Sequence, residues 1–313
     1  MAITNPTAEP RTDTISVVIP SYRSAGVLPD AIDSVLNQTL PVDEIIVVDD
    51  GSEDGTEAVC RKYDGHIRYF HQTNQGASSA RNAGLAASRG QWLAFLDADD
   101  VWEPEKLEIQ FAALQQNPEA DFVITASLAW SSHEQGYVAY RWNGPLDPKV
   151  LRAELLVRNI FTGLCSSLLI RRPAVEAVGG FASGKACEDR RIAIELLEDH
   201  RALILPHALV RQRPGPAHWT DPERHRGEMI RLIEDYGALY EELDSTGRLK
   251  RRARARVHER SGMHYLENGD LRSAAHDLIR AACLWPFMPN PWRVLINASL
   301  GRLRPRRLSK LGA

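Results

Sequence analysis

Residues 91–100, QWLAFLDADD, form an apolar run that ends in three carboxylates, Asp97, Asp99 and Asp100. The apolar part has the length and composition of a buried strand. A hydrophobic core has no use for three carboxylates that repel one another. They form either a solvated turn or a site for a positively charged ligand, and the rest of the chain bears on that choice.

Three more short apolar segments precede this run, and helical patterns separate them. The expected strands are residues 15–20 (ISVVIP), 43–52 (DEIIVVDDGS) and 66–72 (HIRYFHQ). The expected helices are residues 26–39, 54–63 and 76–90. Alternating helices and apolar strands predict an α/β fold, with a mostly parallel, Rossmann-like sheet flanked by helices on both faces.

Polar clusters follow three of these expected strands. In open α/β sheets, ligands bind beyond the carboxyl ends of the strands. The clusters are Pro20, Ser21 and Tyr22 after the first strand, Asp49 and Asp50 after the second, and residues 97–100 after the fourth. Turn chemistry explains each cluster alone, but explains three on one edge less well. Closely spaced carboxylates suit Mg²⁺ or Mn²⁺, with substrate phosphates completing the coordination shell.

The second half of the chain shifts towards helices. Residues 188–200, EDRRIAIELLEDH, form an amphipathic helical pattern with Glu188 and Asp189 at its N-terminal end. The helix dipole favours carboxylates there, so capping alone explains this pair. Residues 223–285 are expected to be helical, and residues 259–286 have the pattern of one tetratricopeptide-like hairpin, which cannot form an independent array.

Composition indicates a soluble globular protein in a reducing compartment. The 313 residues are 43% hydrophobic, and the four cysteines are scattered without a metal-ligand or disulfide spacing. No apolar run reaches the ~18 residues of a membrane span, and no signal peptide precedes the first strand. The expected location is cytoplasmic.

The net charge of −3 conceals an asymmetry between two parts of the chain. Residues 245–313 hold 15 Lys and Arg against 4 Asp and Glu, so the remaining residues are acidic. Two explanations stay open for the basic part: contact with anionic lipid head groups or nucleic acid, or solvated helix faces that balance the acidic part. Because the basic part lacks the interleaved aromatics of a stacking platform, no nucleic-acid partner is expected.

Two longer stretches closely resemble glycosyltransferase family 2, whose catalytic domain has the GT-A fold. They are residues 17–56, VVIPSYRSAGVLPDAIDSVLNQTLPVDEIIVVDDGSEDGT, and residues 74–107, NQGASSARNAGLAASRGQWLAFLDADDVWEPEKL. Residues 179–196 match less tightly. The resemblance implies transfer of a sugar from a nucleotide-diphosphate donor, with inversion at the anomeric carbon and a divalent metal, Mn²⁺ or Mg²⁺.

The resemblance also assigns residues. It implies that Pro20 and Tyr22 lie near the base, that Asp50 accepts a hydrogen bond from the uracil imide, and that Arg81 closes over the base and phosphates. Asp97 would face the ribose or sugar. Asp99, with Asp97 in the same Asp-x-Asp, would hold the metal on the phosphates. Asp189 would be the general base.

One departure from the family pattern lies beside the expected base. Many relatives carry an aromatic residue after the Glu-Asp pair, where this chain has Arg190 and Arg191. Two explanations stay open: the arginines favour a phosphorylated or lipid-diphosphate acceptor, or they form the exposed face of a helix, which is the usual place for charges. His218 and Trp219 match a segment that approaches phosphate or sugar in relatives, although such residues are more often structural.

Together these observations predict three parts: a disordered leader (residues 1–13), a GT-A catalytic domain (14–220) and a helical extension with a basic tail (221–313). The expected function is transfer of a sugar, with UDP as the expected nucleotide, to a hydroxyl of a glycan or lipid-linked acceptor in surface polysaccharide biosynthesis. Peripheral contact with an anionic membrane surface fits the basic part. The alternatives are a non-catalytic nucleotide-sugar binder on the same scaffold and a dinucleotide-dependent oxidoreductase. The oxidoreductase lacks its Gly-x-Gly-x-x-Gly after the first strand.

Overall fold

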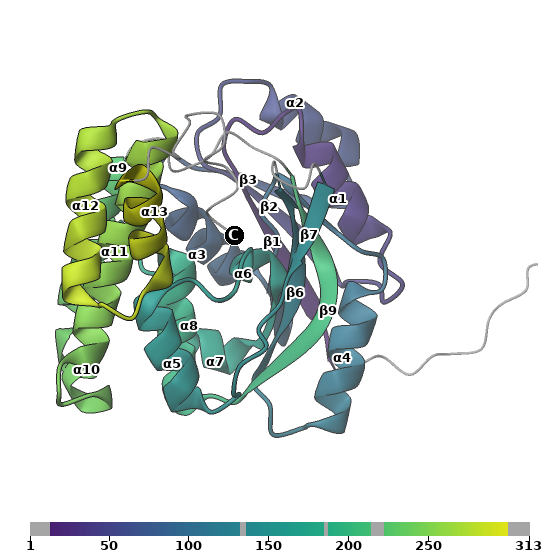
Figure 1. The fold of residues 1–313 in the computed structure, drawn as a ribbon. Coiled ribbons are helices and arrows are strands. Elements are labelled where there is room, and N and C mark those ends of the chain that lie inside the picture. The colour runs from purple at the N-terminus through teal and green to yellow at the C-terminus, as the bar shows by residue number, and fades with distance from the viewer. Residues whose placement is uncertain (1–12, 132–135, 185–186, 214–221, 300–313) are drawn as a thin grey trace, which may run out of the picture. The chain divides into compact units, whose positions relative to one another are not determined.

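The computed structural model describes residues 13–131, 136–184, 187–213 and 222–299 (Figure 1). Most of the expected leader, the basic tail after residue 299, and His218 with Trp219 lie outside the described residues. The chain divides into two compact units. The first unit comprises Met1–Leu128, Gly163–Gly184 and Asp199–Arg213, and the second comprises Ala129–Thr162, Lys185–Glu198 and Pro214–Ala313.

The described strands belong to a single sheet. They are β1 (Ile15–Ser21), β2 (Glu44–Asp49), β3 (Arg68–His71), β4 (Trp92–Phe95), β5 (Asp100–Trp102), β6 (Phe122–Ser131), β7 (Gly136–Tyr140), β8 (Leu168–Arg171) and β9 (Ala202–Gln212). Their order is β3-β2-β1-β4-β8-β6-β9-β5, and β7 pairs with β6. The first four strands run parallel, whereas β4 with β8, β8 with β6, and β5 with β9 are antiparallel. The predicted α/β class with a mostly parallel sheet is confirmed for the N-terminal half.

Helices and one short 3₁₀ segment connect the strands of the first unit. They are α1 (Leu28–Leu36), α2 (Thr56–Cys60), η1 (Arg61–Tyr63), α3 (Ala77–Ala87), α4 (Lys106–Gln116), α6 (Leu164–Ser167) and α7 (Arg172–Ala177). Alternation along β1 and β2 divides their side chains between two faces. Val17 and Val47 lie in one buried cluster with residues of α1, α2 and α4, while Ile46 and Val48 pack against the small residues of α3. Both faces are therefore covered, as the apolar strands predict.

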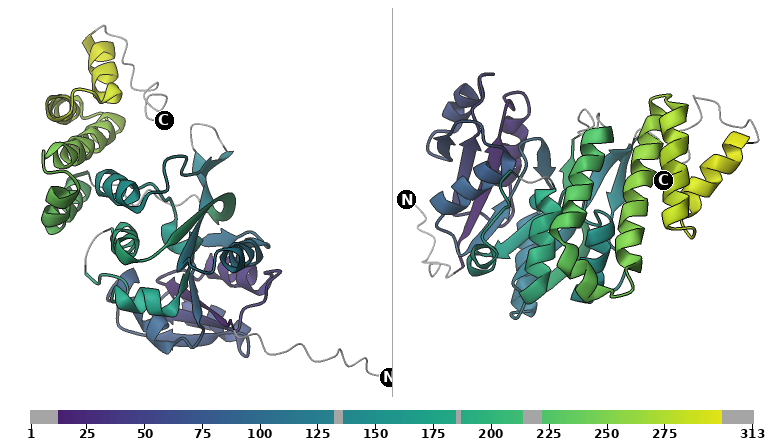
Figure 2. Two further views of the ribbon diagram at one scale, coloured as in Figure 1. Left: turned by 90° about the horizontal axis from the view of Figure 1, so that it is seen from below. Right: turned by 90° about the vertical axis from the view of Figure 1, so that its left-hand side faces the viewer.

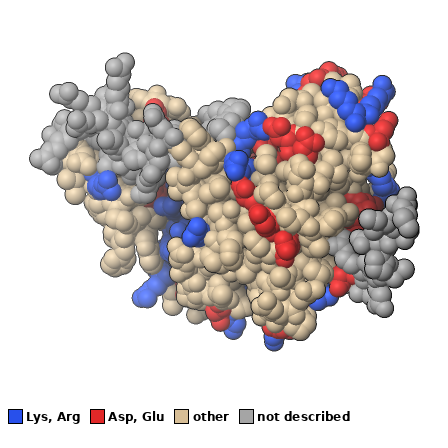
Figure 3. Space-filling model, turned by 90° about the vertical axis from the view of Figure 1, so that its right-hand side faces the viewer, with Lys and Arg blue, Asp and Glu red and all other residues tan. Residues whose placement is uncertain are grey.

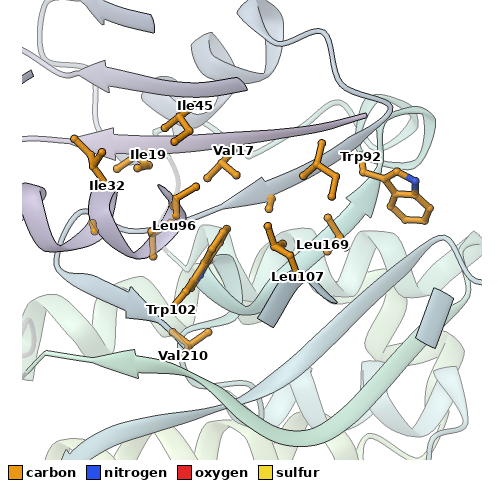
Figure 4. Packing of buried hydrophobic residues seen from close by; sticks show 14 of the residues in the cluster. Val17, Ile19, Ile32, Ile45, Trp92, Leu96, Trp102, Leu107, Leu169 and Val210 are labelled. Atoms are coloured by element: carbon orange, nitrogen blue, oxygen red, sulfur yellow. The ribbon is translucent and has the colours of Figure 1, made fainter. Parts of the chain in front are cut away.

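Trp102 occupies the centre of the larger core cluster. Figure 4 shows its indole between Leu96, Leu107 and Val210, which come from three different segments. Its indole N–H donates to the Ser166 carbonyl oxygen at 2.7 Å, which satisfies the one polar group of this buried ring. The short strand β5, which begins at the third carboxylate, Asp100, is thereby fixed at the end of the acidic run.

The second unit is mainly helical. Its helices are α5 (Pro148–Val157), α8 (Glu188–Asp199), α9 (Pro222–Asp235), α10 (Gly237–Leu243), α11 (Arg248–Glu267), α12 (Leu271–Leu284) and α13 (Pro289–Ser299). Helices α9, α11 and α12 pack side by side (Figures 1 and 2). The turn at residues 268–270 joins α11 to α12, which confirms the expected helical hairpin. None of the described helices has the length and apolar character needed to cross a bilayer.

Candidate active site

The strand register brings the ends of β1, β2 and β4 together at one edge. Ser21, the last residue of β1, lies opposite Asp49, the last residue of β2, and the Asp50 amide donates to the Ser21 carbonyl at 2.8 Å. The Leu96 amide donates to the Val18 carbonyl at 3.0 Å, so the chain is still beside β1 at the residue that precedes Asp97. The polar clusters that follow these three strands therefore share one edge, as parallel strands require.

Asp49 and Asp50 are buried acids that organise the neighbouring loops. Asp49 accepts hydrogen bonds from the Ser52 amide at 2.9 Å and from the Tyr69 hydroxyl at 2.8 Å. Asp50, with only 3% of its surface exposed, accepts from the Gln72 side chain and from the amides of Gln75 and Gly76, at 2.7 to 2.9 Å. A carboxylate offers about four lone-pair positions, so three of those of Asp50 are used inside the protein.

The loop after β1 is tied to the loop after β2 by three backbone amides. The amide of Arg23 donates to the Ser52 hydroxyl at 2.7 Å, that of Ser24 to Thr56 at 3.3 Å, and that of Ala25 to Asp54 at 3.0 Å. Arg23 has a φ of 51°, in the left-handed region that non-glycine residues rarely adopt. This fixed loop presents the exposed Tyr22 ring, while Pro20 is buried within β1.

Arg81 and Asp97 form a close ion pair. Arg81 extends from α3, is buried, and donates from Nη2 to Asp97 Oδ1 at 2.6 Å. Its guanidinium also lies over the Phe181 ring, 5.3 Å from the centroid. Two predicted site residues that are 16 positions apart in sequence are therefore in direct contact. This ion pair places the positive charge of the Arg81 guanidinium at the end of β4.

Asp100 lies in a different environment from the two acids before it. It is buried and accepts a 2.6 Å hydrogen bond from the Ser166 hydroxyl, which itself accepts from the Asp97 amide at 3.1 Å. Burial raises the pKa of the Asp100 carboxyl well above its usual range, and the charge of Asp97 adds to this effect. Asp100 is thus a buried structural acid, while Asp97 and Asp99 are partly exposed.

The end of β4 fits a divalent cation of the kind that the family resemblance implies. Asp97 and Asp99, with one residue between them, supply hard oxygen donors. The negative charge of these two carboxylates contributes to the raised pKa of Asp100. In the part of the chain that the structure describes, no group of three or more His, Cys, Asp or Glu side chains is placed to hold a metal alone. A cation here would therefore take further oxygen ligands from diphosphate or water.

Asp189 belongs to the second unit, in the first turn of α8. Its Oδ2 accepts from the Asn159 side-chain amide at 3.2 Å, and its Oδ1 accepts from the Arg190 amide at 2.7 Å. Asn159 Oδ1 accepts from the Phe161 amide at 3.1 Å, which orients the Asn159 amide group so that its N–H faces Asp189. The carboxylate of Asp189 is therefore held in a defined orientation.

The exposed position expected for Arg190 and Arg191 is wrong, because both side chains are buried. The Arg190 guanidinium donates to the Leu155 carbonyl, with Nε at 3.0 Å, and Arg191 pairs with Asp235 at 2.7 Å. Burying a charge costs less when it is paired or hydrogen-bonded; Arg191 has an ion pair, and Arg190 donates hydrogen bonds to a backbone carbonyl. Their charges serve packing within the second unit, so the structure also gives no support to a phosphate-binding role for them.

Two polar residues of the site were not predicted from the sequence. Ser166 bridges Asp97 and Asp100, and Asn159 orients Asp189. Neither residue belongs to a recognisable motif, and each lies at least 30 residues from its partner in sequence. Only the three-dimensional structure reveals these contacts.

Solved structures with the same fold include two nucleotide-sugar complexes. The mannosyltransferase PcManGT from Pyrobaculum calidifontis, in complex with GDP-Man and Mn²⁺, has a TM-score of 0.61 at 20% identity, over 96% of this chain and 84% of that one. S. aureus TarS 1-349, in complex with UDP-GlcNAc, has a TM-score of 0.56 at 17% identity, over 86% and 91% of the two chains. At such identities the likeness establishes the fold, which is that of the GT-A glycosyltransferases.

Sequence comparison then gives the family. The family described as Glycosyl transferase family 2 matches residues 16–179, more than half of the chain. The chain belongs to glycosyl transferase family 2.

Among its curated relatives is the "Putative teichuronic acid biosynthesis glycosyltransferase TuaG" of Bacillus subtilis (strain 168). The two sequences are 35% identical over 169 residues, which cover 50% of this chain and 62% of that one. The chain spans between 15% and 62% of the length of the curated relatives that it matches.

Proposed function

We propose that the protein is a metal-dependent, inverting glycosyltransferase. It moves a sugar from a nucleotide-diphosphate donor, with UDP as the expected nucleotide, to a hydroxyl group of a glycan or lipid-linked acceptor. The observation that carries this proposal is the shared edge of β1, β2 and β4, where the loop with Tyr22, the buried Asp50, and the Asp97–Asp99 acids follow adjacent strands. Within this account, residues 14–220 form the catalytic domain and residues 221–313 the helical extension.

The first unit would bind the donor. The exposed ring of Tyr22, on the fixed loop after β1, would contact the base, and Pro20, buried near the end of β1, would lie near it. Asp50 would accept the uracil imide N–H with its remaining lone pair, since its other hydrogen bonds hold the loop of residues 72–76 in place. Asp97, held by Arg81, would face the ribose or sugar.

Asp99, with Asp97 as its neighbour, would hold the Mn²⁺ or Mg²⁺. Such a cation, when bound, neutralises charge that develops on the departing diphosphate. Arg81 would add a fixed positive charge near the phosphates, although its ion pair with Asp97 already uses part of it. A preorganised charge of this kind stabilises a transition state without a cost of reorganisation.

Asp189 would act as the general base that removes the proton of the acceptor hydroxyl. Attack of that hydroxyl on the anomeric carbon, opposite to the departing diphosphate, inverts the configuration at that carbon. The hydrogen bond from Asn159 would hold one carboxylate oxygen, which fixes the direction in which the carboxylate accepts the proton. A positioned base contributes a factor of about 10² to 10⁴ in rate.

The relatives agree with this reaction class and leave the sugar open. The name of the B. subtilis relative refers to teichuronic acid biosynthesis, and this supports a role in polysaccharide biosynthesis. The two solved structures hold UDP-GlcNAc and GDP-Man, so the choice of UDP rests on the resemblance around Asp50. We place the protein at the cytoplasmic side of a membrane, in peripheral contact with anionic lipid, where a lipid-linked acceptor is accessible.

Nucleotide release from UDP-sugars and GDP-sugars, with and without Mn²⁺, tests the function. Wild type should release either UDP or GDP, and the release should depend on Mn²⁺. Asp189→Asn should lower kcat by about 10²- to 10⁴-fold and leave donor binding unchanged. Suppose instead that wild type binds the donor but releases no nucleotide, with either glycan or lipid-linked acceptors supplied. The protein would then be the non-catalytic nucleotide-sugar binder.

A further inference from the structure

The outer surface of α12 and α13 combines exposed apolar side chains with cations. Helix α12 packs on α11 and α13 packs on α12, around a buried cluster that contains Leu266, Leu278 and Val294. Other side chains of the two helices and of the turn between them are exposed at the surface of the second unit. We call the exposed apolar and basic side chains used below the α12–α13 ridge; its members are Arg272, Ile279, Arg280, Phe287, Trp292, Arg293 and Ile296.

Four large apolar side chains of the ridge are exposed. Phe287, in the turn, has 84% of its surface exposed, and Ile279, Trp292 and Ile296 have about half of theirs exposed, at 51%, 45% and 55%. The turn is fixed, because the Trp292 indole N–H donates to the Pro286 carbonyl at 2.8 Å. Phe287 also contacts Trp285 edge to face, with ring centroids 5.8 Å apart. The outward position of Phe287 is therefore a built feature of the turn.

All exposed charges of the ridge have the same sign. Arg272, Arg280 and Arg293 are exposed, and the single carboxylate of residues 271–299 is Asp277. Asp277 is buried and is held by His258 at 2.9 Å and by Arg226 at 3.3 Å, so it contributes no negative charge to the surface. The face drawn in Figure 3 differs, because acidic and basic side chains lie close together on it.

We propose that the α12–α13 ridge binds the surface of an anionic lipid bilayer, with the apolar side chains inserted between head groups and the arginines in contact with lipid phosphates. Interfacial helices combine aromatic and aliphatic residues with Lys and Arg in this way. Trp292 suits the head-group level, where its apolar ring and its N–H find matching surroundings. This inference rests on the peripheral lipid contact that the proposed function includes, and names the surface that makes it; vesicle binding is measured without donor or acceptor, so its failure is distinguishable from a failure of sugar transfer.

Charge and chemistry favour lipid over other occupants. A second copy of the same ridge would bring arginine against arginine, and like charges across an interface are unfavourable. A nucleic acid would attract the arginines but would offer nothing to Ile279 and Ile296, whereas acyl chains accept both. An anionic bilayer satisfies the whole set of side chains.

Co-sedimentation of the full chain with vesicles tests this proposal. The vesicles contain phosphatidylcholine alone, or phosphatidylcholine with phosphatidylglycerol. We expect binding to the anionic vesicles that weakens as salt rises. Phe287→Ser should lower the partition coefficient at least about tenfold, since a buried phenyl group is lost. Arg280→Gln and Arg293→Gln should each lower it about fivefold.

Matched controls come from the same unit. Leu146→Ser removes an apolar side chain that is 60% exposed but lies outside the ridge, and Arg224→Gln removes an exposed arginine of α9; both should bind vesicles like wild type. Thermal unfolding of each variant verifies that it is folded. Binding that is equal on both vesicle types, or unaffected by Phe287→Ser, would overturn the proposal. So would a wild-type dimer in light scattering that Phe287→Ser converts to a monomer, because the ridge would then be an interface between copies.

Discussion

Asn159 is the residue whose role depends most directly on a single contact. Its side-chain amide donates to Asp189 Oδ2 at 3.2 Å, and its own orientation is set by the Phe161 amide. We expect Asn159→Ala to lower kcat by about 10- to 100-fold with little change in the KM for the donor, because a misplaced base affects the chemical step more than donor binding. The measurement is steady-state nucleotide release at saturating and limiting donor.

Two further variants separate positioning from simple loss of structure. Asn159→Asp keeps the shape of the side chain and places a second carboxylate against Asp189, so it should be at least as damaging as Asn159→Ala. Asn117→Ala removes a comparable amide at the C-terminal end of α4, whose hydrogen bond goes to the Ala113 carbonyl of that helix, and it should retain wild-type kcat. Full activity in Asn159→Ala would show that Asp189 needs no such partner.

Helix α3 packs on β1 and β2 through its small residues, and at Gly84 the helix closely approaches Val18 of β1. A methyl group at Gly84 would meet Val18 Cγ1 at 2.2 Å, and Val18 is fully buried in β1. Gly84→Ala should therefore lower the free energy of unfolding by about 1–3 kcal/mol. Gly227→Ala in α9 is the matched control, because a methyl group there meets nothing within 4 Å. It should stabilise the protein by about 0.5–1 kcal/mol. Urea denaturation measures both effects, and equal stabilities for the two variants would contradict this account of the packing.

The first turn of α4 contains an unusual buried lysine. Lys106 donates to Gln110 Oε1 at 2.8 Å and its ammonium group lies 3.9 Å from the centre of the Trp102 ring. Burial lowers the pKa of Lys106 well below its usual range. The unfolded state therefore binds more protons than the native state between the native pKa and about 10.4, so stability rises with pH through that window. The destabilisation is fully present below the native pKa.

Lys106→Met removes this titration. The free energy of unfolding of the variant, relative to that of wild type, should fall as the pH rises from the native pKa of Lys106 towards about 10, near which an unfolded lysine titrates. The measurement is the difference between the two proteins in the free energy of unfolding, taken at several pH values so that other titrating groups cancel. A difference that stays constant with pH would show that Lys106 has an ordinary pKa in the native state.

Across the whole molecule, features that depend on local sequence patterns were predictable, and contacts between distant segments were not. The apolar segments and the acids behind them predicted β1, β2, β4 and their shared edge, because parallel βαβ units follow from local alternation. The order β8-β6-β9-β5, with the antiparallel pairs β8–β6 and β9–β5, was not predictable, because pairing depends on contacts between distant segments. The same reason explains the errors at α8: the partners that bury Arg190 and Arg191 lie 35 and 44 residues away.

Whether the edge of β1, β2 and β4 holds a metal-bound nucleotide diphosphate can be tested directly. The test is a calorimetric titration of the full chain with UDP, with and without Mn²⁺, on wild type, Asp99→Ala and the surface control Glu119→Ala. We expect Mn²⁺-dependent binding to wild type and to Glu119→Ala, with the dependence on Mn²⁺ lost in Asp99→Ala. Binding to Asp99→Ala that matches wild type in both conditions would contradict the assignment of Asp99. An absence of binding to wild type by UDP and by GDP alike would contradict the donor site itself.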